Sequence, residues 1–395
     1  MTSAALADEA QVGNAAAAQA AAAANQQIED NSAWMDQLTS WRIKPEEPTE
    51  FANTYEADVV VVGAGLAGIN ASRAAAEAGA SVITLEDGQT FEVHGFGVAS
   101  LNPKMAEDQG LHNDPVEYFR EFTRQHGMRV NDDLIRTWCD ESGPAFDWWE
   151  EVLPPACDYD PSSEDYKTSY RSVLYWPSEP AENFEGEQFK HFSGGIDFCY
   201  ESFRYAGQCI VDKCLELGVD FHYETTAYML TQDADGVVTG VIAQDKDGNY
   251  EKYVAKKGVI LCAGTYSLAQ DMVNEFHADQ VLHENRKSGD FMYMSLMPGT
   301  GAGQRMAIWA GAEMEPWQQR TSISMSDFHA TPGLSINQLG KRWHNEDTEI
   351  WTRAIELENQ PGRFAWEVID SNWMDLLPYT SHGHLALDPL NVTFW

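Results

Sequence analysis

Cysteine is scarce in this sequence, with six among 395 residues. No two cysteines form a C-x-x-C pair, and their spacing matches no zinc, iron–sulfur or haem-attachment motif. His382 and His384 stand two residues apart with no third ligand at a suitable spacing, so we expect a polar loop there and no metal site. The cysteines are too few for a disulfide framework, and we interpret them as reduced, mostly buried thiols. They are Cys139, Cys157, Cys199, Cys209, Cys214 and Cys262.

Basic side chains are also few: 25 lysines and arginines stand against 62 aspartates and glutamates, a formal net charge of -37. A surface this negative repels nucleic acid and anionic membranes, so we exclude both as partners. An anionic small-molecule substrate stays compatible, because a local pocket can be positive within a negative field.

Long apolar runs are absent, since none approaches the roughly 18 residues of a transmembrane helix. We therefore predict no membrane insertion. Ala5-Leu6-Ala7 has the small-x-small form of a signal-peptidase site, but no basic region or apolar core precedes it. The chain is predicted to be cytoplasmic as the sequence stands; export is the alternative if the true start lies upstream of Ala5–Ala7. An ordinary alanine-rich tail explains the same residues.

Residues 1–53 are predicted to form a flexible, alanine-rich tail. Ala15–Asn25 is almost pure alanine, which favours a helix but offers no second face to bury. Trp34 and Trp41 are suited to pin a short helix onto the body of the protein. The prolines that follow end any helix, so the chain enters the next segment extended.

The pattern then changes to that of a βαβ unit. Asp58–Val62 carries a β-branched run, typical of a strand buried on both faces of a parallel sheet. A glycine turn at 63–68, a helical segment to Gly79 and a second apolar strand, Ser81–Leu85, lead to Glu86. Strand, turn, helix, strand and terminal acid in this order predict a dinucleotide-binding fold.

Each glycine of the turn has an expected role. Gly63 permits the tight turn, Gly65 lets a pyrophosphate approach the backbone, and Gly68 lets the helix pack close to the strand. The phosphates would lie at the helix N-terminus, where free N–H groups favour negative charge. Glu86 is placed to accept hydrogen bonds from an adenosine ribose. This unit alone is compatible with NAD or FAD.

Helical spacing marks two further stretches, residues 113–151 and 198–217. Residues 153–190, which lie between them, are rich in Pro, Ser, Glu and Tyr and are predicted to form a long surface excursion.

Strand patterns follow the second helical stretch. Phe221–Thr226, Val237–Gln244 and Tyr250–Lys256 alternate like antiparallel strands, with glycine-containing turns before the last two. Gly258–Gly264 is predicted to be another buried parallel strand that ends in small residues.

Several short motifs are spread along the chain from about Tyr55 to about Glu346. They are Val59–Gly68, Glu86, His94–Asn102, Asn113–Pro115, Phe192–Gly195, Thr225–Ala227, Val259–Thr265 and Gly299–Ala307. Together they resemble the FAD-binding flavoprotein family of fumarate reductases, urocanate-type reductases and ketosteroid dehydrogenases. The resemblance implies FAD as cofactor and an α/β fold: a Rossmann-like FAD-binding domain with a parallel sheet, an antiparallel β-meander and an inserted cap domain.

The resemblance also assigns residues to the cofactor. His94–Asn102 is similar to the loop that lies against the isoalloxazine ring, with Ala99-Ser100 in place of the usual paired glycines. In some members a histidine near this loop carries the flavin covalently, which makes His94 the candidate; a hydrogen-bonding or packing role is the alternative. The predicted cofactor-binding residues are Gly63, Ala64, Gly65, Leu66, Ala67, Gly68, Glu86, Asp87, His94, Gly95, Gly97, Val98, Ala99, Ala227, Ala263, Gly264 and Thr265.

The part of the chain expected to carry the catalytic residues resembles the family less closely. Asn337–Glu346 resembles the family's hairpin leading into an active-site glutamate of a proton path, so Glu346 is the predicted catalytic residue. The family's arginine three residues later is Glu349 here, and its second arginine position falls near Trp373. Arg353, on the same helical face as Glu346, is the predicted replacement, with a surface ion pair to Glu349 as the alternative. These departures favour an aromatic or larger substrate over a dicarboxylate.

We expect four regions: the tail 1–53, an FAD-binding domain 54–268, an inserted capping (substrate) domain 269–330 and a return to the FAD domain over 331–395. The predicted function is FAD-dependent reduction, or formation, of an activated C=C bond, with a small-molecule substrate and an electron donor protein or reduced carrier as partners. The family continues into a segment that this sequence does not contain, so a truncated non-catalytic remnant or partner subunit is the alternative. An NAD-dependent dehydrogenase is a weaker one, since such folds do not need the late strand 258–264.

Overall fold

A computed structural model describes residues 40–93, 97–108, 112–125, 130–153, 171–182, 188–197, 200–276, 299–314, 333–345, 356–357, 359–368 and 370–372. Its helices are η1 (Ser40–Arg42), α2 (Leu66–Glu77), α3 (Lys104–Glu107), α4 (Pro115–Gln125), α5 (Asp132–Glu150), α6 (Tyr200–Glu216), α7 (Gln270–Phe276), α10 (Ala302–Trp309) and η3 (Pro361–Arg363). Its strands are β1 (Asn53–Val62), β2 (Val82–Leu85), β3 (Gly97–Leu101), β4 (Arg171–Glu182), β5 (Gln188–Asp197), β6 (Asp220–His222), β7 (Thr226–Gln232), β8 (Val238–Gln244), β9 (Tyr250–Leu261), β10 (Leu334–Asn337) and β11 (Ala365–Val368).

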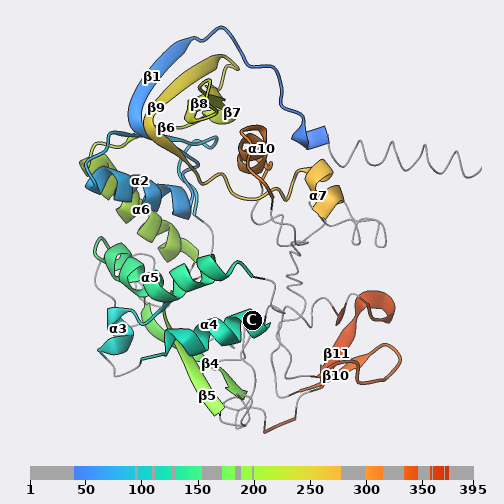
Figure 1. Ribbon diagram of the computed structural model, residues 1–395. Coiled ribbons are helices and arrows are strands. Elements are labelled where there is room, and N and C mark those ends of the chain that lie inside the picture. Colours follow the sequence, from blue (N-terminus) through green and yellow to red (C-terminus); the bar gives the residue numbers. More distant parts are fainter. Residues whose placement is uncertain are drawn as a thin grey trace, which may run out of the picture.

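A six-stranded mixed sheet forms the centre of the fold, in the order β6-β2-β1-β9-β8-β7 (Figure 1). β6, β2, β1 and β9 run parallel, whereas β8 pairs antiparallel with both β9 and β7. This confirms the predicted fold class, a parallel sheet joined to an antiparallel meander.

The valines of β1 are buried on both faces of this sheet, as predicted. Val61 packs in a cluster with Ile69 of α2 and with residues of α5 and α6. Val60 and Val62 point to the opposite face, where they pack in a cluster that includes Met306 of α10. A strand covered on both faces needs apolar residues at successive positions, which explains the valine run.

β9 joins two segments that the sequence predicted as separate strands, 250–256 and 258–264. It runs unbroken to Leu261 and pairs parallel with β1 along its length, with a register shift between Ala57 and Val59. Its first part also pairs antiparallel with β8. One strand thus closes the meander and extends the parallel sheet, and the prediction of two strands was wrong.

The predicted antiparallel strand Phe221–Thr226 was also wrong. β6 occupies the start of this segment and pairs parallel with β2. The meander begins at Thr226, where β7 pairs with β8. Glu224, between β6 and β7, has φ 51°, so the chain turns there and leaves one edge of the sheet for the other.

A second, three-stranded sheet has the order β3-β5-β4. Both pairings are antiparallel, and β3 meets β5 in the register Ala99 to Gly195. β4 and the first residues of β5 lie inside residues 153–190. Part of the predicted surface excursion is therefore sheet.

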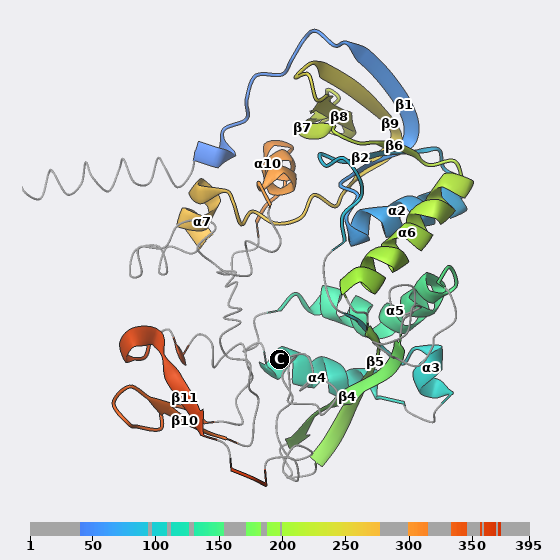
Figure 2. The same cartoon turned by 180° about the vertical axis from the view of Figure 1, so that it is seen from behind.

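The predicted helical stretches contain α4, α5 and α6. The side chain of Asn131 caps α5 by accepting hydrogen bonds from the backbone N–H groups of Asp133 and Leu134. α6 packs beside α2 on one face of the central sheet, and α5 lies next to this pair (Figures 1 and 2). No helix within the described ranges combines the length and hydropathy that a membrane crossing requires.

The cysteines of the described residues are free thiols. Cys139 and Cys214 are buried, and Cys209 and Cys262 are partly buried. Burial raises the pKa of Cys214 to about 12, which makes this thiol unreactive at neutral pH. Cys157 and Cys199 lie outside the described residues.

Trp41 fastens η1 to α7 and α10, which lie together in both views (Figure 2). Its indole is buried and donates a hydrogen bond of 2.6 Å from Nε1 to Oε2 of Glu275 in α7. Its backbone oxygen accepts a bond of 3.0 Å from Nε1 of Trp309 in α10. This contact confirms the predicted anchoring role of Trp41, whereas Trp34 lies outside the described residues.

We expect the substitution Trp41→Ala to lower the free energy of unfolding by about 3–5 kcal/mol, because it empties a fully buried aromatic site. Ile43→Ala is the matched control: its side chain is 73% exposed, so the change should stay within about 0.5 kcal/mol. Urea denaturation of both variants measures the difference. Equal losses would show that η1 is not anchored in solution.

The domain limits stay a prediction. Met306 of α10, which falls inside the expected capping domain 269–330, packs against the central sheet. β10 and β11, inside the expected return segment 331–395, form a two-stranded sheet of their own (Figure 1).

Candidate functional site

The turn between β1 and α2 is packed so tightly that two of its glycines cannot carry a side chain. Gly63 has φ +98°, and a Cβ there would collide with the backbone oxygen of Cys262. A Cβ on Gly68 would collide with the backbone oxygen of Gly63. β1, β9 and α2 therefore converge at this turn, at the carboxyl end of the parallel strands.

Gly65 differs from both. Its φ is -71°, which any residue adopts, and a Cβ there would contact only the backbone oxygen of Glu92, at 3.6 Å. A Cβ would therefore fit at this position without a collision, unlike at Gly63 and Gly68. Gly65 is also the N-cap of α2 and provides no side-chain bond to the first N–H groups of the helix. A helix N-terminus whose first N–H groups have no side-chain cap fits a phosphate group.

Glu86 closes the turn from the end of β2. Its Oε2 accepts a hydrogen bond of 2.6 Å from the backbone N–H of Ala64, and its Oε1 accepts one of 2.9 Å from Gly88. Burial raises the pKa of Glu86 and a hydrogen bond with Asp87 adds to this, although the two backbone donors act in the opposite direction. A carboxylate has further lone pairs, so acceptance of ribose hydroxyls stays a prediction compatible with these bonds.

The segment expected near adenine lies beside Glu86. The backbone N–H of Thr225 donates to the backbone oxygen of Glu86, and that of Glu224 donates to Gly88, each at 2.8 Å. Ala227 follows in β7. The structure thus brings together the predicted ribose and adenine residues, Asp87 included, although they come from distant parts of the chain.

Ala263, Gly264 and Thr265 follow β9 and meet a second glycine turn. The backbone N–H of Gly301 donates to the backbone oxygen of Thr265 at 3.0 Å, and Nε2 of Gln304 in α10 donates to that of Gly264 at 3.1 Å. Gly264 has φ +73°, the left-handed region that favours glycine. These bonds fix the predicted residues after β9 next to the N-terminus of α10.

The predicted isoalloxazine loop is a strand over part of its length. Gly97, Val98 and Ala99 belong to β3, which is held by α5 as well as by β5. The backbone N–H of Leu101 donates to Oγ of Ser142 at 2.9 Å.

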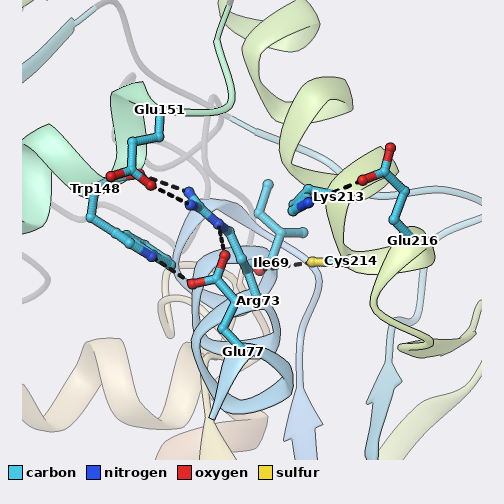
Figure 3. Close-up of polar contacts among 8 residues, drawn as sticks. All are labelled: Ile69, Arg73, Glu77, Trp148, Glu151, Lys213, Cys214 and Glu216. Carbon is cyan, nitrogen blue, oxygen red and sulfur yellow. Dashed lines mark hydrogen bonds and ion pairs between the residues drawn. The ribbon is translucent and has the colours of Figure 1, made fainter. Parts of the chain in front are cut away.

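α5 is in turn held to α2 by a cluster around the buried Arg73, the Arg73 clamp: Arg73, Glu77, Trp148 and Glu151 (Figure 3). The guanidinium of Arg73 donates from Nε to Glu77 at 2.8 Å and from Nη1 to the backbone oxygen of Trp148 at 2.9 Å. It lies 3.9 Å from the centre of the Trp148 ring, whose Nε1 donates to Glu77 at 2.7 Å. The clamp therefore connects the phosphate-turn helix to the helix that supports β3.

Three buried polar atoms without a hydrogen-bond partner stand on elements that border this site: Oδ1 of Asn70, Oγ of Ser100 and Oε1 of Gln304. The side-chain N–H groups of Asn70 and Gln304 donate to the backbone oxygens of Leu66 and Gly264, so the unpaired atom of each is an acceptor. Buried polar atoms are normally paired. The fit to FAD is clearest at the turn, where the first N–H groups of α2 have no side-chain cap and Glu86 stands at the end of β2.

The predicted catalytic residues Glu346 and Arg353 lie outside the described residues, as do His94, Gly95, Trp373 and His384. The hairpin before Glu346 is described as far as Asn345; in it, Oδ1 of Asn337 accepts bonds from the backbone N–H groups of Leu339 and Lys341. The described side chains include no group of three or more His, Cys, Asp or Glu suited to hold a metal ion.

Sequence reasoning missed the Arg73 clamp and the unpaired side chains. Arg73 carries one signal, a glutamate four residues later in an alanine-rich helix, but Trp148 is 75 residues away. Ser100 and Gln304 lie inside segments that were singled out as small-residue or glycine motifs, and Asn70 follows the glycine turn; only their unpaired atoms distinguish them.

Comparison with known proteins agrees with this geometry. Residues 58–322 match the protein family described as FAD binding domain. A probable fumarate reductase of Shewanella frigidimarina is 25% identical over 338 residues, which make up 79% of this chain and 50% of that protein. A urocanate reductase of Eggerthella lenta is 29% identical over 323 residues, 80% of this chain and 46% of that protein.

A solved structure shares the fold. The 3-ketosteroid-Δ4-(5α)-dehydrogenase of Rhodococcus jostii, in complex with 4-androstene-3,17-dione, superposes with a TM-score of 0.65 at 21% identity, over 83% of this chain and 69% of that one. The chain spans about half the length of the curated relatives it matches. Because the family match covers more than half of the chain and includes the phosphate turn, the chain belongs to the FAD binding domain family.

Proposed function

We propose that this chain is an FAD-dependent oxidoreductase of the fumarate-reductase type, which reduces or forms an activated C=C bond of a small organic substrate. The phosphate turn carries the proposal, because Gly65 would accept a Cβ whereas Gly63 and Gly68 would not, and all three lie inside the matched family segment. The names of two relatives, a fumarate reductase and a urocanate reductase, support the C=C chemistry.

The residues that would hold FAD come from separate elements. The N–H groups from Gly65 to Gly68, at the N-terminus of α2, would receive the pyrophosphate, and Glu86 with Ala227 the adenosine. The ends of β9 and β3 would flank the flavin half. When bound, FAD supplies hydride-transfer chemistry.

The roles proposed for the residues around the substrate are inferred from the sequence. Glu346 would belong to the path that brings a proton to the carbon next to the one that receives hydride, with Arg353 beside it. Residues 269–330 would form a cap that excludes water. An aromatic or larger unsaturated acid is the proposed substrate class, and a donor protein or reduced carrier would supply the electrons.

The test uses FAD-loaded protein that has been reduced chemically without oxygen. Addition of urocanate should reoxidise the flavin faster than addition of fumarate, and Glu346→Gln should slow this reoxidation without changing FAD binding. Bound FAD that no unsaturated acid reoxidises would contradict the catalytic proposal and leave a non-catalytic FAD-binding subunit. Acid precipitation of the same sample reports the linkage, since colour in the pellet would identify a covalent flavin and make His94 the attachment candidate.

A further inference from the structure

η1 lies before the matched family segment 58–322, yet it packs against two helices of that segment, α7 and α10 (Figures 1 and 2). Nε1 of Trp41 donates to one carboxylate oxygen of Glu275 in α7, and Nη2 of Arg42 donates to the other at 2.5 Å. The Arg42 guanidinium also lies 4.3 Å from the centre of the Trp41 ring. The backbone oxygen of Trp41 accepts the bond from Trp309 in α10. η1 therefore connects two helices of a segment to which it does not belong.

α7 depends on tertiary contacts for its position. It has seven residues, Gln270–Phe276, and an isolated helix of this length is not stable in water. Its buried residues Met272 and Val273 pack in one cluster with Trp41 and Tyr266. Trp41 is the largest fully buried side chain of this cluster. Its loss would therefore remove a large part of the apolar contact that holds α7 in place.

α7 and α10 are also fixed to each other. Nη2 of Arg305 in α10 donates to both carboxylate oxygens of Asp271 in α7, at 2.8 and 3.0 Å. Gly301, the N-cap of α10, has no room for a Cβ, which would collide with Sδ of Met272. Because close-packed contacts transmit displacements, a shift of α7 would move the N-terminus of α10.

The N-terminus of α10 in turn holds two residues that are predicted to bind the cofactor. The backbone N–H of Gly301 donates to the backbone oxygen of Thr265, and the side chain of Gln304 donates to that of Gly264. Both acceptors lie beyond Leu261, where the pairing of β9 with β1 ends. These two bonds therefore help to set the position of the backbone there, and a continuous series of contacts leads from η1 to this point.

We propose that Trp41 is a positioning residue for FAD: it holds α7 and α10 so that Gly264 and Thr265 meet the flavin half of the cofactor. This inference rests on the proposed binding of FAD. Trp41 acts only through the two helices and does not touch the cofactor. Coupling between two sites is reciprocal, so bound FAD also strengthens the docking of η1.

The experiment uses three variants of the full chain. Trp41→Ala empties the buried site, and Trp309→Phe keeps an aromatic ring but removes the N–H that joins α10 to η1. Val82→Ala is the control, because Val82 is buried at the amino end of β2, away from Glu86, and belongs to a different cluster from Trp41. FAD affinity and the visible flavin spectrum are measured at a temperature at which each variant is folded. Hydrogen exchange of peptides that contain Trp41 is measured with and without FAD.

The variants should differ in FAD affinity more than in stability. Trp41→Ala should bind FAD about tenfold more weakly and Trp309→Phe about threefold, each with a changed flavin spectrum, because both loosen α10. Val82→Ala should lose stability but bind FAD within about twofold of the unmodified chain, because it lies far from the coupled contacts. By reciprocity, bound FAD should slow exchange at Ser40–Arg42 of the unmodified chain by about tenfold, and by less in Trp309→Phe.

The outcomes separate the two proposals. An unmodified chain that binds no FAD would overturn this assignment and the proposed function together. Unchanged affinity in both tryptophan variants, or an equal loss in Val82→Ala, would overturn the role of Trp41 and leave FAD binding in place. If Trp41→Ala does not fold, Trp309→Phe decides the question alone. A purely structural Trp41 would lower stability without changing the FAD affinity of the folded protein or the exchange of η1 on binding.

Discussion

Replacement of Gly65 by leucine is expected to abolish FAD binding while the protein stays folded. The position has an ordinary φ, and a Cβ there meets no close contact, so the free energy of unfolding should change by no more than about 1 kcal/mol. The leucine side chain would fill the space over the N-terminus of α2 in which the pyrophosphate is expected. We predict a loss of affinity of at least about 100-fold, as measured by FAD titration.

Gly68→Ala is the control for Gly65→Leu. It adds a single carbon, but that carbon would collide with the backbone oxygen of Gly63. The free energy of unfolding should fall by about 3 kcal/mol or more, because a close-packed site has no room for the added methyl group. The larger residue at 65 should thus be tolerated by the fold, and the smaller one at 68 should not. Equal destabilisation by the two would contradict this difference between Gly65 and Gly68.

Arg73→Ala is expected to lower the free energy of unfolding by about 3–5 kcal/mol. The side chain is 2% exposed and is held by hydrogen bonds to Glu77 and to the backbone of Trp148, so removing it leaves partly buried acceptors unpaired. The free energy of unfolding of Arg73→Lys should lie between those of the unmodified protein and Arg73→Ala. Lysine keeps the charge but loses the planar guanidinium and its stacking on Trp148. Denaturant unfolding measures all three proteins.

Lys213→Ala is the matched control for Arg73, because Lys213 forms an ion pair with Glu216 on the neighbouring helix α6 (Figure 3). Its loss should cost no more than about 0.5 kcal/mol, as is usual for exposed pairs. An Arg73 variant as stable as this control would show that the clamp does not hold α5 to α2.

The Arg73 clamp also gives a pH dependence. Burial raises the pKa of Glu77, but hydrogen bonds from Trp148 and Arg73 outweigh burial and leave this pKa below its ordinary value. The contribution of Glu77 to stability should therefore be present above the ordinary pKa of a carboxyl group and be lost as the pH falls through the lowered value. In Arg73→Ala this part of the acid dependence should be weaker.

The βαβ unit could be predicted from the sequence because its signals are local. Four consecutive valines require a strand buried on both faces, and Gly63 and Gly68 occupy positions where a Cβ would collide with backbone. The helical stretches could be predicted for the same reason, because the spacing of their apolar residues is also a local signal.

The rest depended on contacts between distant residues. β6 and β9 pair with strands far away in the chain, so a local alternation could not show that β6 is parallel or that β9 is one strand. The neighbours of Arg73 and the missing partner of Ser100 are likewise properties of the folded molecule.

The most direct test of the account is an FAD titration of the purified full chain, followed by visible absorption, with Gly65→Leu in parallel. We predict saturable binding with a perturbed flavin spectrum for the unmodified chain and none for Gly65→Leu. An unmodified chain that stays colourless and leaves the spectrum of added FAD unchanged at saturating concentration would contradict it.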